Sequence, residues 1–76
     1  MTRLPVISGK KAIRALKRID YNIDHQTGSH VILRCMKPPY RRLTVPDHKE
    51  LAPGTLRSII REAGITVERF VELLRK

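Results

Sequence analysis

His30 combines a residue type and a sequence position that could do chemistry. It follows the predicted turn Thr27-Gly28-Ser29 and opens an apolar stretch, Val31-Ile32-Leu33. Because imidazole titrates near neutral pH, an accessible histidine can give or accept a proton during phosphodiester cleavage without a metal. Gly28 permits close approach of a ligand backbone, and neighbouring cations could hold a phosphate beside the ring. The alternative is a surface histidine without a chemical role.

The direction of the His30 side chain follows from strand alternation. Successive side chains of a strand point to opposite faces, and the odd-numbered positions are the more apolar set in all three predicted strands. We expect this set to face the helices: Tyr21, Ile23, Val31, Leu33, Cys35, Leu43 and Val45. The opposite face then holds mainly polar side chains, with Ile32 as its one clear apolar member: Asn22, Asp24, Gln26, His30, Arg34, Arg42 and Thr44. His30 is therefore expected on an open, cationic face, and a one-residue slip in register would bury it.

The other two histidines are interpreted in the same way. Strand alternation places His25 on the helix side of the sheet, which argues against an acid–base pair with His30, although a register slip would reverse this conclusion. His48 lies in a predicted polar loop, where a solvated or turn-stabilising role is expected. The three histidines and Cys35 have no zinc-site spacing, and no Gly-rich phosphate loop or nucleophile elbow is present. We therefore expect no metal and no cofactor.

Three predicted strands form an antiparallel meander that positions these side chains. Tyr21 and Ile23 mark the first strand, and residues 31–35 the second. The segment Lys37-Pro38-Pro39-Tyr40 ends the second strand, because neither proline can donate to the ladder. Residues 41–45 form the third strand, which Pro46 closes.

Helices are predicted before and after this meander. Ser8 suits the N-cap of a helix over residues 9–19, and Pro53 and Gly64 suit the first turn and the C-terminal cap of a second helix. Thr66 can cap a further helix. The expected apolar positions are Ala12, Ile13, Leu16 and Ile19 in the first helix, and Phe70, Val71 and Leu74, flanked by Leu73, in the last. The sequence thus predicts an α+β fold: a helix, a three-stranded antiparallel sheet with one face covered, and a broken helix or two short ones.

The charge of the chain points to a polyanionic partner. Among 76 residues, 16 are Lys or Arg and 7 are Asp or Glu, which gives a net charge of +9. Nucleic acid is the commonest polyanion in a cell, and a membrane is a weaker alternative because no basic amphipathic helix carries bulky aromatic anchors. The length suits one small domain over residues 1–76. The single cysteine excludes an internal disulfide, and without a membrane span or a secretory segment we expect a cytoplasmic protein.

Ordered motifs extend over nearly the whole chain: Ser8-Gly9-Lys10, Gly28-Ser29-His30, Leu43-Thr44-Val45-Pro46, His48-Lys49-Glu50-Leu51, Gly54-Thr55-Leu56-Arg57-Ser58-Ile59 and Ala63-Gly64-Ile65-Thr66. In this order the chain resembles the HicA-type toxins of bacterial toxin–antitoxin systems. These are small mRNA interferases with a fold like that of double-stranded-RNA-binding domains. The chain differs from the family pattern at His25 and Thr27, where basic residues are common.

The resemblance implies a function and a site. His30 stands at the position of the family's catalytic histidine, in a metal-independent endoribonuclease that cleaves mRNA and arrests translation. A HicB-type antitoxin is the implied protein partner, and it would cover the active site. We expect RNA contacts from the turn and from basic side chains: Gly28, Ser29, Lys10, Lys11, Arg34, Arg42 and Lys49. The alternatives are a non-catalytic RNA-binding module of the same fold and a regulatory partner protein that has lost catalysis.

Overall fold

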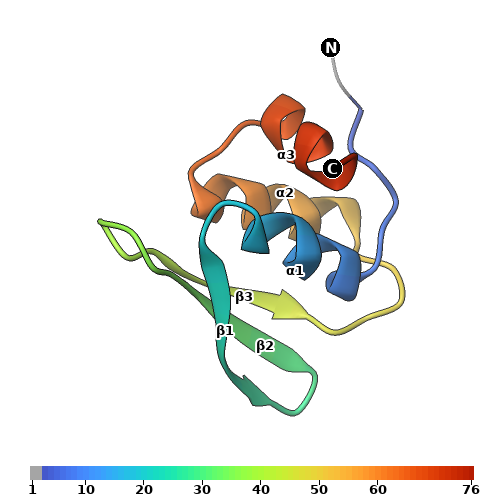
Figure 1. The fold of residues 1–76 in the computed structure, drawn as a ribbon. Helices are drawn as coiled ribbons and strands as arrows, with labels where there is room; N and C mark the ends of the chain where they lie inside the picture. The colour runs from blue at the N-terminus through green and yellow to red at the C-terminus, as the bar shows by residue number, and fades with distance from the viewer. Residues whose placement is uncertain (1–2) are drawn as a thin grey trace.

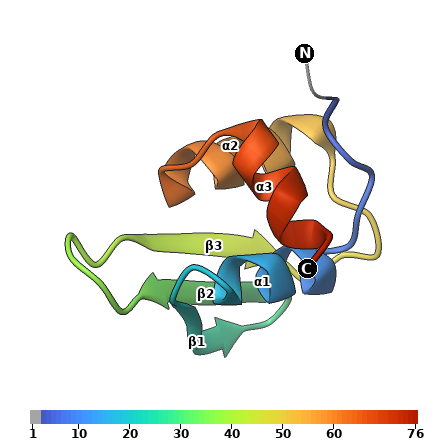
Figure 2. The ribbon, with the colours of Figure 1, turned by 45° about the horizontal axis from the view of Figure 1, so that its top comes forward.

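A computed structural model describes residues 3–76 (Figure 1). The elements in chain order are α1 (Gly9–Lys17), β1 (Tyr21–Thr27), β2 (His30–Cys35), β3 (Arg42–Pro46), α2 (Pro53–Ala63) and α3 (Val67–Leu74). The strands pair antiparallel in the order β1-β2-β3. The three helices gather on one side of this sheet, with α1 across the strands and α2 alongside β3 (Figure 2). The predicted α+β architecture is confirmed, and it is consistent with a fold like that of double-stranded-RNA-binding domains.

Helix α1 begins as predicted and ends earlier than predicted. The Ser8 side chain accepts a hydrogen bond from the backbone N–H of Lys11 at 3.1 Å, which satisfies one of the unpaired donors of the first turn. The helix ends at Lys17 rather than at residue 19, because the chain turns toward β1 through Asp20, whose φ of 72° is left-handed. Ile19 lies outside the helix but still packs against the core.

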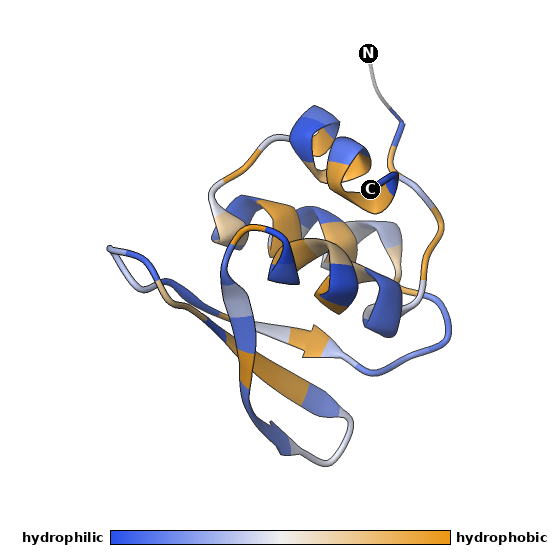
Figure 3. Ribbon diagram, in the orientation of Figure 1, coloured by the Kyte–Doolittle hydropathy of each residue, from blue (hydrophilic) through white to orange (hydrophobic). Residues whose placement is uncertain are grey.

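Burial confirms four of the helix-facing positions that were predicted for β2 and β3. Val31 lies opposite Val45 and Leu33 opposite Leu43, and all four side chains are buried beneath the helices. In Figure 3 the apolar middle of β2 follows a hydrophilic position at the start of the strand. The third strand is shifted by one residue from the prediction and ends at Pro46. The backbone of Pro46 continues this edge strand of the sheet.

A β-bulge interrupts the pairing of β1 with β2. Ile23 lies opposite Leu33 and the next paired residue, His25, lies opposite Ile32, so Asp24 is the extra residue. Because side chains alternate with a period of two, one extra residue exchanges the faces for the rest of the strand. Beyond the bulge the paired residues are His25 with Ile32, Gln26 with Val31, and Thr27 with His30.

The bulge makes two sequence predictions wrong. His25 was expected on the helix side and lies on the open face, and Gln26 was expected on the open face and lies on the helix side. Ile23, before the bulge, faces the helices as predicted, but its side chain is 49% exposed because it lies on the edge strand. Strand alternation was correct for β2 and β3, where no extra residue intervenes.

The two C-terminal helices use the predicted caps. Pro53 opens α2, Gly64 ends it in the left-handed conformation with a φ of 78°, and the Thr66 hydroxyl accepts from the backbone N–H of Arg69 at 3.1 Å to begin α3. The buried residues of α3 are Phe70 and Leu73. Leu73, predicted as a flank, is therefore part of the core, whereas Val71 and Leu74 are only partly buried.

A backbone junction holds α1 against one end of the sheet. The N–H of Gly9 donates to the carbonyl of His48 at 2.9 Å, and the N–H of Asp47 donates to the carbonyl of Ser29 at 2.6 Å. A Cβ atom built on Gly9 would overlap the carbonyl oxygen of Pro46. Since Pro46 lies opposite His30, the first turn of α1, the end of β3 and the β1–β2 turn meet at this point.

We predict that Gly9→Ala lowers the free energy of unfolding by about 1–3 kcal/mol, because the added methyl group forces the helix away from the Pro46 carbonyl. Gly54→Ala is the matched control in the first turn of α2, where a Cβ atom meets nothing within 4 Å. It should be neutral or stabilise by up to about 1 kcal/mol. Urea unfolding of both variants measures the difference. Equal stability of the two variants would contradict the close packing at Gly9.

A second prediction concerns Tyr21, whose buried hydroxyl donates to the carbonyl of Ala63 at 3.2 Å. Burial raises the pKa of Tyr21 above 10.0, the negative charge of a Cys35 thiolate adds to this effect, and the positive charge of Arg41 opposes it. The unfolded chain therefore loses this proton at lower pH than the folded protein does. The stabilisation from Tyr21 is present below about pH 10 and is lost as the pH rises through the higher folded-state pKa.

Tyr21→Phe should accordingly cost about 0.5–1.5 kcal/mol of unfolding free energy at neutral pH. It should also make stability fall less steeply in alkaline solution than in the wild type. Urea unfolding at neutral pH and above about pH 10 tests both parts. Tyr40→Phe, at a side chain that is 60% exposed, is the control. A Tyr21→Phe protein with the alkaline sensitivity of the wild type would disprove this origin of the pH dependence.

Candidate active site

His30 lies at the start of β2 on the face of the sheet that the helices leave uncovered (Figures 1 and 2). Its direct neighbours across the sheet are Thr27 on β1 and Pro46 on β3. The residue is exposed. The structure therefore places His30 where strand alternation predicted, with its ring open to a ligand, and its chemical role stays a prediction.

Arg34 and Arg42 lie opposite each other on the same face, on β2 and β3, and both are exposed. Ile32 and Thr44 form the pair between them and His30. Arg34 lies four positions after His30 along β2, which is about 13 Å at a rise of 3.3 Å per residue. The arginine pair can thus hold an anionic group on this face, but at a distance from the imidazole rather than beside it.

The turn before His30 is open on its outer side. Gly28 has a left-handed φ of 57°, and a Cβ atom at this position would meet nothing within 4 Å. The Gln26 side-chain amide donates to the Gly28 carbonyl at 2.9 Å, and the Ser29 carbonyl accepts from Asp47. Hydrogen bonds from the protein therefore hold the backbone of Gly28 and Ser29, two of the predicted site residues. Their outer surface is free to contact the backbone or a phosphate of a ligand.

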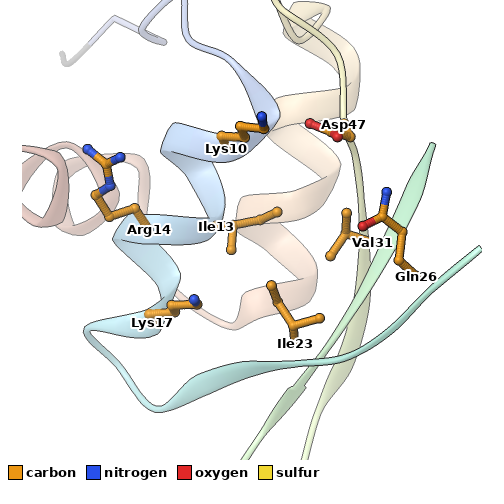
Figure 4. A pocket seen from close by; sticks show the side chains of 8 residues that line it. All are labelled: Lys10, Ile13, Arg14, Lys17, Ile23, Gln26, Val31 and Asp47. Atoms are coloured by element: carbon orange, nitrogen blue, oxygen red, sulfur yellow. The ribbon is translucent and has the colours of Figure 1, made fainter.

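The predicted lysines lie away from the open face. Lys10 contributes to a cleft of about 280 Å³ between α1 and the β1–β2 hairpin (Figure 4), whereas Lys11 lies on the flank of α1 nearer the end of α3. Lys49 is exposed in the loop after β3. The side chains that line the cleft are Lys10, Ile13, Arg14 and Lys17 of α1, Ile23, Gln26 and Val31 of the hairpin, and Asp47. The predicted RNA-binding side chains therefore lie in separate places: Arg34 and Arg42 on the open face, Lys10 in the cleft, Lys11 on the α3 side of α1, and Lys49 in the loop after β3.

Asp24 and His25 form a bonded pair near His30 that the sequence did not predict. Because of the bulge, His25 shares the open face with His30, and its Nδ1–H donates to the Asp24 carboxylate at 2.8 Å. An aspartate followed by a histidine is an ordinary pair in a polar strand, so no signal in the sequence marked it. Only the pairing of β1 with β2 shows that both side chains lie near the His30 edge of the sheet.

Tyr21 and Lys37, whose pKa values are raised, lie away from this face. The Lys37 ammonium donates a hydrogen bond to the Asp20 carboxylate at 3.0 Å, and this bond raises the pKa of Lys37. Within residues 3–76 no three His, Cys, Asp or Glu side chains group as a set of metal ligands. No helix in this part of the chain is long and apolar enough to cross a membrane.

Comparison with known proteins identifies the family. The sequence model of a family described as the HicA toxin of bacterial toxin–antitoxin systems matches residues 9–65. No curated protein matches the chain. The matched segment begins at the glycine that contacts Pro46, contains the whole sheet with His30, and ends just after the Gly64 cap. It covers most of the sequence, and the resemblance found in the motifs is confirmed. The chain belongs to the HicA toxin family of bacterial toxin–antitoxin systems.

Proposed function

We propose that this protein is an endoribonuclease that cleaves mRNA and thereby arrests translation, with His30 as a general acid or base. The observation that carries the proposal is the exposed imidazole of His30 on an uncovered, cationic sheet face beside an open turn. Membership of a toxin family supports it. Cleavage in which the 2′-hydroxyl attacks the adjacent phosphorus needs proton transfers that imidazole can supply near neutral pH, so the proposed reaction is metal-independent.

RNA binding is proposed to use both cationic groups. Arg34 and Arg42 would hold a phosphate on the open face, and the lysines and arginine of α1 would hold flanking RNA in the cleft beside the hairpin. A net charge of +9 supports such contacts. The backbone amides near Gly28 and Ser29 are proposed to stabilise the charge that develops on the phosphorane. This reaction would place the protein with its mRNA substrate in the cytoplasm.

The antitoxin is proposed to be a HicB-type protein that covers the open sheet face. A partner with an acidic surface would neutralise Arg34 and Arg42 and exclude RNA from His30 at the same time. Complementary charge of this kind speeds association and favours the correct partner. The residues that bind substrate and those that bind the antitoxin would then overlap.

We predict that His30→Ala slows RNA cleavage by about 10²–10⁴-fold, the usual contribution of general acid–base catalysis. The fold and RNA binding should persist because the side chain is exposed. Cleavage of mRNA by purified protein is followed in the presence of EDTA, and His48→Ala is the control histidine in the β3–α2 loop. Cleavage by His30→Ala at the wild-type rate would reject the catalytic role. Salt-sensitive binding by the wild type without new RNA ends would instead identify a non-catalytic RNA-binding module.

We also predict that Arg34→Gln and Arg42→Gln each weaken RNA binding and reduce its salt dependence. Each phosphate contact to single-stranded RNA contributes about 0.7 to the slope of log affinity against log salt concentration. Binding is measured in the His30→Ala background so that the RNA stays intact. Arg75→Gln, at the end of α3, is the charge-matched control. Slopes that are the same in all three variants and in the parent would place the RNA elsewhere.

A further inference from the structure

We propose that His25 is a second proton-transfer residue of this site and that Asp24 positions it. The inference rests on the proposed RNA cleavage and adds to it a residue that strand alternation had placed on the opposite face. Its structural basis is the bulge at Asp24, which turns His25 onto the face that carries His30. Bulges are known to re-aim side chains next to active sites.

The hydrogen bond between Asp24 and His25 defines the orientation of the imidazole. In a regular strand, neighbouring side chains point to opposite faces and do not bond each other. Here Nδ1 of His25 lies 2.8 Å from Oδ2 of Asp24. A carboxylate can only accept, so Nδ1 carries the hydrogen. Nε2 is left free to exchange a proton with a ligand, and the His25 side chain is 55% exposed.

The register places the two imidazoles around a shared space. Thr27 lies opposite His30 and His25 lies opposite Ile32, so His25 and His30 are diagonal neighbours on adjacent strands. Such neighbours are about 7–8 Å apart, within reach of one group held between two rings. No helix packs on this face (Figures 1 and 2). The charged groups around His25 and His30 are Asp24, which is bonded to His25, and Arg34 and Arg42 on the same face of β2 and β3.

Two histidines on one phosphodiester can divide the two proton transfers of cleavage. One imidazole takes the proton of the 2′-hydroxyl while the 2′-oxygen forms its bond to phosphorus. The bond from phosphorus to the 5′-oxygen breaks, and the second imidazole, as imidazolium, gives this oxygen its proton. The products are a 2′,3′-cyclic phosphate and a 5′-hydroxyl, and no other reactant is consumed.

The hydrogen bond from His25 to Asp24 distinguishes the two imidazoles. Within residues 3–76 Asp24 is the one carboxylate that hydrogen-bonds a histidine ring. This bond holds the His25 ring through Nδ1–H and leaves Nε2 free to face the leaving group. The proposal assigns His25 as the general acid toward the 5′-oxygen and His30 as the general base toward the 2′-hydroxyl.

The test uses an oligoribonucleotide that the wild-type protein cuts at one mapped site, and the same RNA with sulfur in place of the 5′-bridging oxygen at that site. A thiolate leaves without being protonated, so a general acid is dispensable on the second substrate. His25→Ala and His25→Gln should cut the oxygen substrate about 10²–10⁴-fold more slowly than the wild type. On the sulfur substrate they should approach the wild-type rate, whereas His30→Ala should stay slow on both.

Asp24→Ala tests the positioning role through a readout that a merely structural residue would not change. Asp24→Ala should slow cleavage of the oxygen substrate, but less than His25→Ala does. On the sulfur substrate, Asp24→Ala should cleave at about the wild-type rate. In the His25→Ala background it should cost nothing further, because both substitutions remove the same function. His48→Ala should match the wild type on both substrates, and thermal unfolding checks that every variant is folded.

The possible failures are distinguishable. If the wild type leaves the RNA intact, the proposed function is rejected, and this inference is rejected with it. If the wild type cuts and the His25 variants cut equally fast, only the inference is overturned. It is also overturned if the His25 variants are slow to the same extent on the oxygen and sulfur substrates, since His25 would then not protonate the leaving group.

Discussion

The burial of one sheet face beneath the helices is the constraint on which the rest of this structure depends. Leu33 and Val45 are fully covered, and Leu16, Leu56 and Phe70 complete the same core. A chain of 76 residues has enough apolar side chains for one such layer. The second sheet face is consequently left to polar side chains. The site on this face contributes little to the core, so its residues can serve chemistry without a large effect on stability.

The bulge at Asp24 is the one place where the sheet departs from strict alternation, and it shapes both of its surfaces. Before the bulge, Ile23 faces α1 and contributes to the cleft. After it, Gln26 continues the cleft wall, while His25 and Thr27 join His30. A single extra residue therefore supplies a polar lining to the cleft and a second imidazole to the open face. The increased local twist at a bulge also bends the hairpin.

The junction around Gly9 connects these two surfaces through backbone contacts. The helix start touches Pro46, Asp47 bonds the turn at Ser29, and His30 pairs with Pro46. These backbone contacts tie the turn before His30 to the start of α1 and to the end of β3. If RNA binds both surfaces as proposed, it would meet a backbone frame that is already assembled, and preorganisation of this kind lowers the cost of binding.

Local signals in the sequence were sufficient for most of the fold. Ser8, Pro53, Gly64 and Thr66 mark helix ends through interactions with residues a few positions away, and all four acted as predicted. Alternation in β2 and β3 correctly located the core side of the sheet and the open position of His30. These features depend on backbone geometry within one element. For this reason the amino-acid order alone determined them.

The tertiary structure decided the features that need a partner strand or a neighbouring helix. Nothing in Asp24-His25 indicates a bulge, because the extra residue is defined only by which residues of β2 lie opposite. The end of α1 at Lys17 and the inward position of Leu73 likewise depend on packing against elements distant in sequence. The sequence by itself thus determined the fold class and the face of His30. Whether a second histidine joins that face was decided by strand pairing, since a shift of one residue exchanges the two faces of a strand.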